Sequence, residues 1–92
     1  MTTALRVLDV EFMPETKEPG VLYVSERFHL AIHLCAGGCG TAAVMQTAPM
    51  FDGDQHFWTM TRAGDLVTFS PSILQTGCRH HYFIERNQVR WA

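Results

Sequence analysis

Turn-forming residues interrupt this chain so often that only short strands fit between them. Residues 14–20 read PETKEPG, residues 36–40 read AGGCG, and residues 52–54 read DGD. Between these breaks lie short runs rich in β-branched and aromatic residues, which are typical of strands. No segment has the pattern of a long helix, so we predict an all-β, or mostly β, fold with a small antiparallel sheet. The predicted strands cover residues 5–13, 21–25, 28–34 and 42–47, and the predicted hairpins pair 56–61 with 66–69 and 82–86 with 89–91.

The strongest strand pattern lies between Phe28 and Cys35. Apolar residues occupy every second position from Phe28 to Leu34, and the alternate face carries His29, Ala31, His33 and Cys35. This period of two favours a strand. Helix-forming residues from Glu26 to Leu34 leave a helix as the alternative.

Length and charge restrict the classes of protein to which the chain can belong. Ninety-two residues with 47% apolar composition suffice for one domain, which we expect to span 1–92. A net charge of −2 makes nucleic acid an improbable partner. No apolar run approaches the roughly 20 residues of a membrane span, and the first residues lack the apolar core of a signal peptide. We therefore expect a cytoplasmic protein that needs a metal or a partner to stabilise so small a core.

Cysteine and histidine concentrate in two short segments, 33–39 and 78–81. The three cysteines are an odd number, which argues against a disulfide framework and favours metal binding. Cys35-x3-Cys39 and Cys78-x2-His81 form two donor pairs on separate loops, as in structural zinc sites. Glycines at 37, 38 and 40 allow the first loop to turn sharply. The sequence therefore predicts one Zn²⁺ per chain, bound by Cys35, Cys39, Cys78 and His81.

The fourth donor stays open at the level of sequence. His80 lies one position closer to Cys78 than His81 does, and the two would face opposite sides of an extended segment. His33 precedes Cys35 by two residues. His33 and His80 are therefore possible substitutes for His81, or partners that orient the ligands.

Several motifs in the same order resemble a small bacterial and phage family known as a domain of unknown function. The matching segments are 10–14 (VEFMP), 18–25 (EPGVLYVS), 33–35 (HLC), 38–40 (GCG), 71–73 (PSI), 78–82 (CRHHY) and 89–91 (VRW). The resemblance implies a zinc-type metal site and a link to bacterial ubiquitin-like conjugation. Two positions differ from the family pattern, which has a cysteine at position 37 and a serine at position 80. If that cysteine is a ligand in the family, this chain must have rebuilt its site, with His80 or His33.

The leading functional hypothesis is a zinc-stabilised binding or adaptor module without enzymatic activity, whose partner is another protein or a second copy of the chain. Its candidate contact residues are the aromatic side chains Phe51, Phe57, Trp58, Tyr82 and Trp91, although packing in the core is the favoured interpretation of each. One alternative is a metal-dependent enzyme with an open zinc position and Glu11, Asp54 or Glu85 as base. A less favoured alternative is a Rieske-like iron–sulfur carrier. Cys78 as a nucleophile beside the histidines is disfavoured, because metal binding explains the same residues.

Overall fold

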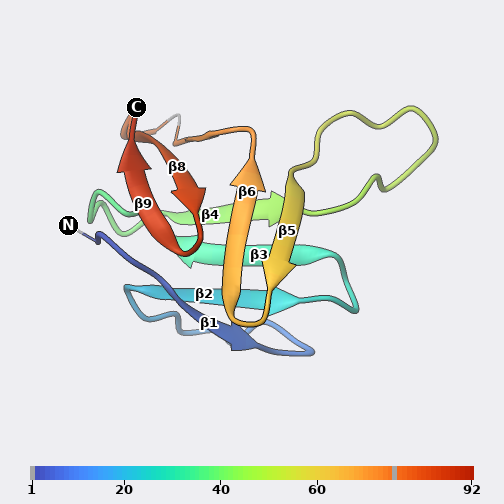
Figure 1. The fold of residues 1–92 in the computed structure, drawn as a ribbon, viewed down its shortest axis with the longest axis horizontal. Coiled ribbons are helices and arrows are strands. Elements are labelled where there is room, and N and C mark those ends of the chain that lie inside the picture. Colours follow the sequence, from blue (N-terminus) through green and yellow to red (C-terminus); the bar gives the residue numbers. More distant parts are fainter. Residues whose placement is uncertain (1, 76) are drawn as a thin grey trace.

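The computed structural model describes residues 2–75 and 77–92, and in these residues the chain forms nine strands and no helix (Figure 1). The predicted fold class is confirmed. The largest sheet has four strands in the order β1-β2-β3-β4. Its members are β1 (Arg6–Asp9), β2 (Val21–Ser25), β3 (Leu30–Leu34) and β4 (Ala42–Gln46). The pair β1–β2 is parallel and the other two pairs are antiparallel.

The second half of the chain forms two smaller antiparallel sheets. One is the hairpin of β5 (Thr59–Ala63) and β6 (Leu66–Ser70), and the other contains β7 (Ile73–Leu74), β8 (His81–Glu85) and β9 (Gln88–Trp91). In Figure 1, β5 and β6 run across the direction of β2, β3 and β4. The hydrophobic core contains residues from both halves of the chain. They include Leu22, Val24, Ala31 and Met45 from the large sheet, and Val67, Phe69, Ile73, Tyr82 and Ile84 from the smaller ones.

The β8–β9 turn ties the C-terminal hairpin to the rest of the fold. Its two residues, Arg86 and Asn87, have φ values of 49° and 67°, as a tight hairpin turn requires. The Asn87 side chain accepts a hydrogen bond from the Val67 backbone and donates one to the Asp65 carbonyl. The turn was predicted one residue later, at Asn87-Gln88. The shift puts Asn87 where its side chain bonds the β5–β6 hairpin.

Other differences from the predicted elements are small and local. Residues 26–29 form a turn before β3, with His29 at a φ of 53°, so the helix alternative for this segment is wrong. The first strand ends at Asp9 rather than at residue 13, and Ile73–Leu74, which lies outside the predicted strands, pairs with β8. In the described part of the chain, no helix is long and apolar enough to span a membrane.

Candidate functional site

The two predicted donor loops meet at one corner of the molecule. The first loop follows β3, where the Cys35 backbone N–H donates to the Thr41 carbonyl at 2.8 Å and the Gly38 N–H donates to the Cys35 carbonyl at 3.0 Å. Gly38 and Gly40 both have positive φ values, 81° and 82°, which favour glycine. The second loop precedes β8. The two loops bring Cys78 next to Cys35 and Cys39, which precede it by 43 and 39 residues in the chain.

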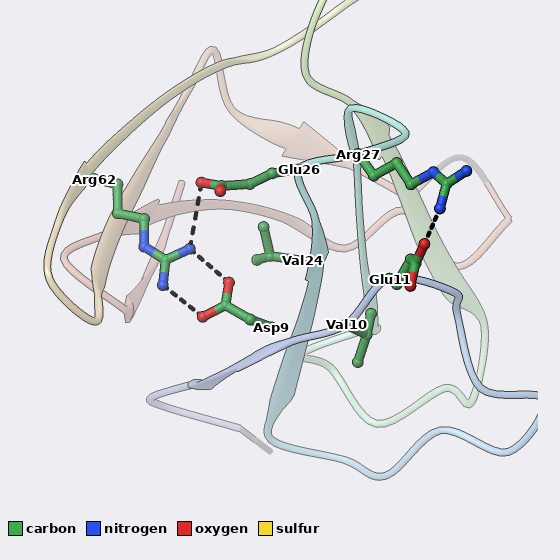
Figure 2. Close-up of a pocket in the computed structure, with 7 residues that line it drawn as sticks. All are labelled: Asp9, Val10, Glu11, Val24, Glu26, Arg27 and Arg62. Carbon is green, nitrogen blue, oxygen red and sulfur yellow. Dashed lines mark hydrogen bonds and ion pairs between the residues drawn. The ribbon is translucent and has the colours of Figure 1, made fainter.

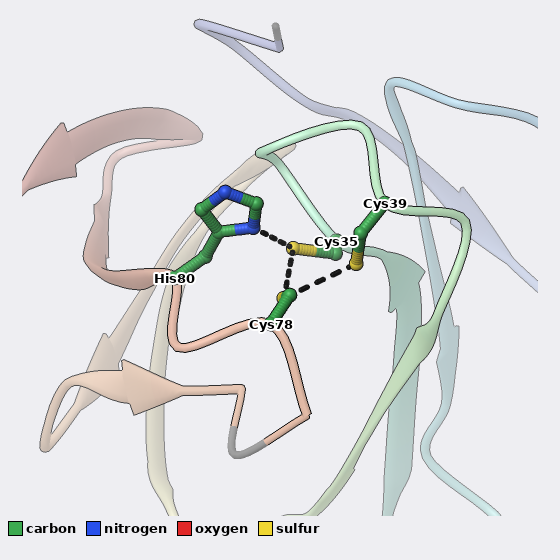
Figure 3. A group of neighbouring side chains, drawn as sticks. All are labelled: Cys35, Cys39, Cys78 and His80. Atoms are coloured by element: carbon green, nitrogen blue, oxygen red, sulfur yellow. Dashed lines mark hydrogen bonds between the residues drawn. The ribbon is translucent and has the colours of Figure 1, made fainter.

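Four side chains converge there: Cys35, Cys39, Cys78 and His80 (Figure 3). Their donor atoms all lie within 4.8 Å of one another. The Cys35 and Cys78 Sγ atoms are 3.7 Å apart, those of Cys39 and Cys78 are 3.2 Å apart, and Cys35 Sγ lies 3.3 Å from His80 Nδ1. In a tetrahedral zinc site with Zn–S bonds of about 2.3 Å, sulfur atoms lie about 3.8 Å apart. The cluster therefore has the donor types and the approximate spacing for such an ion.

The environment of the thiols differs from one side of the cluster to the other. Burial raises the pKa of Cys35 to about 11. Hydrogen bonds from the side chain and backbone of Thr41 lower the pKa of exposed Cys39 to about 6. Low solvation disfavours a thiolate, and hydrogen-bond donors favour it. A cation at the centre would stabilise the thiolate at both positions.

His80 takes the fourth position of the cluster, because residue 37 is glycine. A Cβ atom built on Gly37 would lie 2.2 Å from two atoms of the His80 ring. The ring therefore occupies the space that any other residue at position 37 would fill. Trp91 covers the ring, with a centroid distance of 5.8 Å.

The other two histidines named from the sequence lie outside this cluster. His81 points to Ser72, and its Nε2 atom lies 2.6 Å from Ser72 Oγ. His33 is completely buried, and its Nε2 atom contacts the hydroxyl of Tyr82 at 2.7 Å. Burial lowers the pKa of His33 to about 4. His80 and His81 face opposite sides because they are neighbours in an extended segment, as predicted from the sequence.

Ser72 and His81 form a second candidate site, which sequence reasoning missed. Ser72 precedes β7, and His81 begins β8, which pairs with β7 through Leu74 and His81. His81 is exposed and Ser72 is half-buried. The Ser72 carbonyl accepts a hydrogen bond of 3.3 Å from the Trp58 indole. A serine hydroxyl bonded to an imidazole is the arrangement that makes the oxygen nucleophilic.

The only sequence signal for this pair is the Pro71-Ser72-Ile73 segment, which belongs to the resemblance but has no chemical signature of its own. Within the described residues, no carboxylate is hydrogen-bonded to His81. The pair is therefore a dyad there rather than a Ser-His-Asp triad.

The carboxylates considered as catalytic bases are engaged away from the cluster. Glu11 pairs with Arg27, and Glu85 pairs with Arg90. Asp54 is buried and accepts hydrogen bonds from the backbone N–H groups of Met50 and His56, both at 2.9 Å.

A further pocket, between β1, β2 and β5, is lined by paired charges (Figure 2). Arg62 donates two hydrogen bonds of 2.7 Å to the Asp9 carboxylate and lies 3.7 Å from Glu26. The Arg62 guanidinium lowers the pKa of Asp9. The Arg62–Asp9 pair connects β1 with β5.

Of the aromatic residues considered for a contact patch, Phe51 is exposed and Tyr82 is buried in the core. Trp58 and Trp91 are partly buried against it. The predicted aromatic set is therefore divided between the core and the surface.

Comparison with known proteins places the chain in a family. The family model described as "Bacterial ubiquitination-like system serine protease (BubE)" matches residues 9–92. The chain belongs to this family. The predicted link to a bacterial ubiquitin-like system is thereby confirmed, and it implies protein partners in general. No curated protein and no solved structure matches the chain.

Proposed function

We propose that the chain is a serine peptidase of a bacterial ubiquitination-like system, with Ser72 as nucleophile and His81 as general base. The observation that carries this proposal is the 2.6 Å contact between Ser72 Oγ and His81 Nε2 at the protein surface. The description of the family, which names a serine protease, supports the same chemistry. The substrate class would be a protein of that system, cleaved at a peptide or isopeptide bond.

The chemistry requires only the two side chains and water. Ser72 Oγ attacks the carbonyl carbon of the bond, and His81 Nε2 takes the hydroxyl proton. The C–N bond then breaks, and His81 gives the proton to the departing amine. Water attacks the resulting Ser72 ester, its proton passes through His81 back to Ser72 Oγ, and the carboxylic acid leaves.

In this proposal the cluster of Cys35, Cys39, Cys78 and His80 holds a structural Zn²⁺, one per chain. Three thiolates and one imidazole suit zinc, and four protein donors leave no position for a reactive water. The ion would hold the loop that precedes His81 against the Cys35–Cys39 loop, and this would fix the position of the His81 imidazole beside Ser72. Reduced thiols of this kind suit a reducing compartment such as the cytoplasm.

The alternatives from the sequence are less well supported. An open, catalytic zinc site would need three donors rather than four. A Rieske centre uses two cysteines and two histidines, whereas this cluster has three cysteines and one histidine. A zinc-stabilised adaptor without activity would share the closed cluster, so it must be separated from a peptidase by experiment.

The test is covalent labelling of the zinc-loaded protein with a fluorophosphonate. Attack by a serine oxygen forms an O–P bond and releases fluoride, and mass spectrometry locates the modified residue. We expect label on Ser72, and we expect Ser72→Ala and His81→Ala to lower the labelling rate by on the order of 10³-fold or more. Ser70→Ala, two residues away, is the matched control and should label normally. Equal labelling of Ser72→Ala and the parent protein would leave an adaptor as the better description.

A further inference from the structure

We infer that the pocket beside Ser72 binds an uncharged, apolar side chain of the substrate, next to the bond that is cleaved. The inference rests on the proposed function and adds the substrate class that the site would select. The pocket is lined by Gln55, His56, Phe57, Trp58 and Pro71.

The pocket and the nucleophile share their supporting structure. Pro71 forms one wall and directly precedes Ser72. Trp58 forms another wall, and its indole N–H donates to the Ser72 carbonyl at 3.3 Å. A side chain in this pocket would therefore belong to a residue whose backbone passes close to Ser72.

The lining sets the chemical class of the occupant. The volume is about 200 Å³, the space of roughly seven water molecules in the liquid, which suits one large side chain. Phe57, Trp58 and Pro71 supply apolar surface. No Asp, Glu, Lys or Arg belongs to the five lining residues, and the imidazole of His56 already lies 3.7 Å from the Asp54 carboxylate. A cationic side chain would lose hydration there without a carboxylate in the lining, and an anionic one would meet only His56, which already faces Asp54. An apolar side chain would leave water favourably.

The wall formed by residues 55–58 is held in place before any substrate arrives. The buried Asp54 carboxylate accepts hydrogen bonds from the His56 backbone at 2.9 Å and from Gln46 Nε2 at 2.6 Å. The Trp58 backbone N–H donates to the Gln46 carbonyl at 2.8 Å. Gln46, at the end of β4, thus forms hydrogen bonds at both ends of the wall, with Asp54 and with Trp58. A preformed pocket binds with a smaller entropic cost than a mobile loop.

The experiment uses two small probes on the full, zinc-loaded chain, N-acetyl-phenylalaninamide and N-acetyl-aspartamide. Binding is followed through the indole N–H signal of Trp58 in NMR, assigned with Trp58→Phe because the chain has two tryptophans. We expect the phenylalanine probe to shift this signal and to slow fluorophosphonate labelling of Ser72 several-fold. The aspartate probe should do neither.

Variants connect the effect to the pocket. Phe57→Ala should weaken binding of the phenylalanine probe roughly tenfold, as expected for the loss of one apolar contact surface. Phe51→Ala is the control, because Phe51 is exposed and lies outside the lining. Circular dichroism checks each fold. Gln55→Arg, at an exposed position on the rim, replaces Phe57→Ala if that variant fails to fold, and it should weaken the same binding.

The outcomes separate the two proposals. If fluorophosphonate does not label Ser72, the proposed function fails, and the probe binding alone then describes the pocket. If Ser72 is labelled but the two probes act alike, or Phe57→Ala and Gln55→Arg leave the difference unchanged, the pocket does not select apolar side chains and the inference is overturned.

Discussion

His80 and His81 are neighbours in the chain but belong to two sites with opposite physical character. His80 lies in a partly buried cluster in which four donors converge. His81 lies at the surface beside a single hydroxyl. In the proposed function, an ion bound by the converging thiols and imidazole would stabilise the fold, because it would connect distant parts of the chain. In the same proposal, half-buried Ser72 and exposed His81 would carry the reaction, because a substrate can reach them at the surface. One extended segment thus supports both sites.

The largest expected effect is on the cluster, through loss of the metal. A structural zinc contributes about 10–16 kcal/mol in small domains, which is comparable to the whole stability of a typical protein. Cys35→Ala, or complete removal of zinc by a chelator at neutral pH, should therefore abolish the strand signal in circular dichroism. Added zinc should restore the chelated protein. An unchanged spectrum at zero zinc content would remove the structural role of the cluster.

Next in size is the contrast between the two histidines. His80→Ala should weaken zinc binding by more than the roughly 10- to 100-fold that is typical of residues behind the ligands, and the protein should melt at a lower temperature. His81→Ala should change the free energy of unfolding by less than about 0.5 kcal/mol, since its side chain is exposed, while Ser72 labelling is lost. The measurements are competition with a zinc-binding dye, thermal melting and fluorophosphonate labelling. Identical behaviour of the two variants would contradict the division into two sites.

A smaller substitution tests the space that His80 occupies. Gly37→Ala places a Cβ 2.2 Å from the His80 ring, so the ring or the 36–40 loop must shift and disturb the cluster. We expect weaker zinc binding in a chelator titration, with an effect below that of His80→Ala. Gly77→Ala is the matched control, because its Cβ would meet no atom within 4 Å. Equal zinc affinity of both alanine variants would show that the ring does not depend on this space.

A substitution in the core behind the cluster should lower the free energy of unfolding by less than loss of the metal does. Tyr82→Phe removes the hydroxyl that contacts buried His33 at 2.7 Å, and an unsatisfied buried polar group costs about 1–3 kcal/mol. Urea unfolding of the zinc-loaded protein measures this loss. Tyr23→Phe, which removes a hydroxyl bonded to the Glu18 backbone at 2.9 Å, is the control. Glu18 is exposed although Tyr23 is buried, so water can replace the bond at the Glu18 backbone. A larger loss in Tyr23→Phe than in Tyr82→Phe would contradict the argument.

The smallest expected effect concerns pH and the loop beside the dyad. Hydrogen bonds from the Met50 and His56 backbones lower the pKa of Asp54 from its ordinary value of 3.8. The carboxylate therefore adds stability above that pH, and this stability is lost as the pH falls through the lower, folded-state value. Carboxyl NMR should show Asp54 titrating below 3.8, and Asp54→Asn should flatten the acid side of the stability profile. Asp52→Asn, at an exposed position nearby, should keep the parent profile.

Local sequence signals explain why much of the sheet could be predicted. Strand β2 has its predicted bounds, Val21–Ser25, because Gly20 closes the preceding loop and the strand residues are apolar. Both hairpins lie where turn residues separate β-forming runs. The alternation in β3 was also visible, yet the sequence did not reveal which face is inside. The face of Ala31, His33 and Cys35 is the more buried one, because the smaller sheets cover it.

The sequence alone determined a turn-rich β fold and two cysteine-bearing loops, because these depend on residue types within a few positions of one another. Tertiary structure decided which histidine joins the cysteines, since the ring of His80 needs the empty space over Gly37. It also decided that Ser72 meets His81, nine residues later, through the pairing of β7 with β8. Such contacts depend on how distant segments pack, and no local pattern in the chain encodes them.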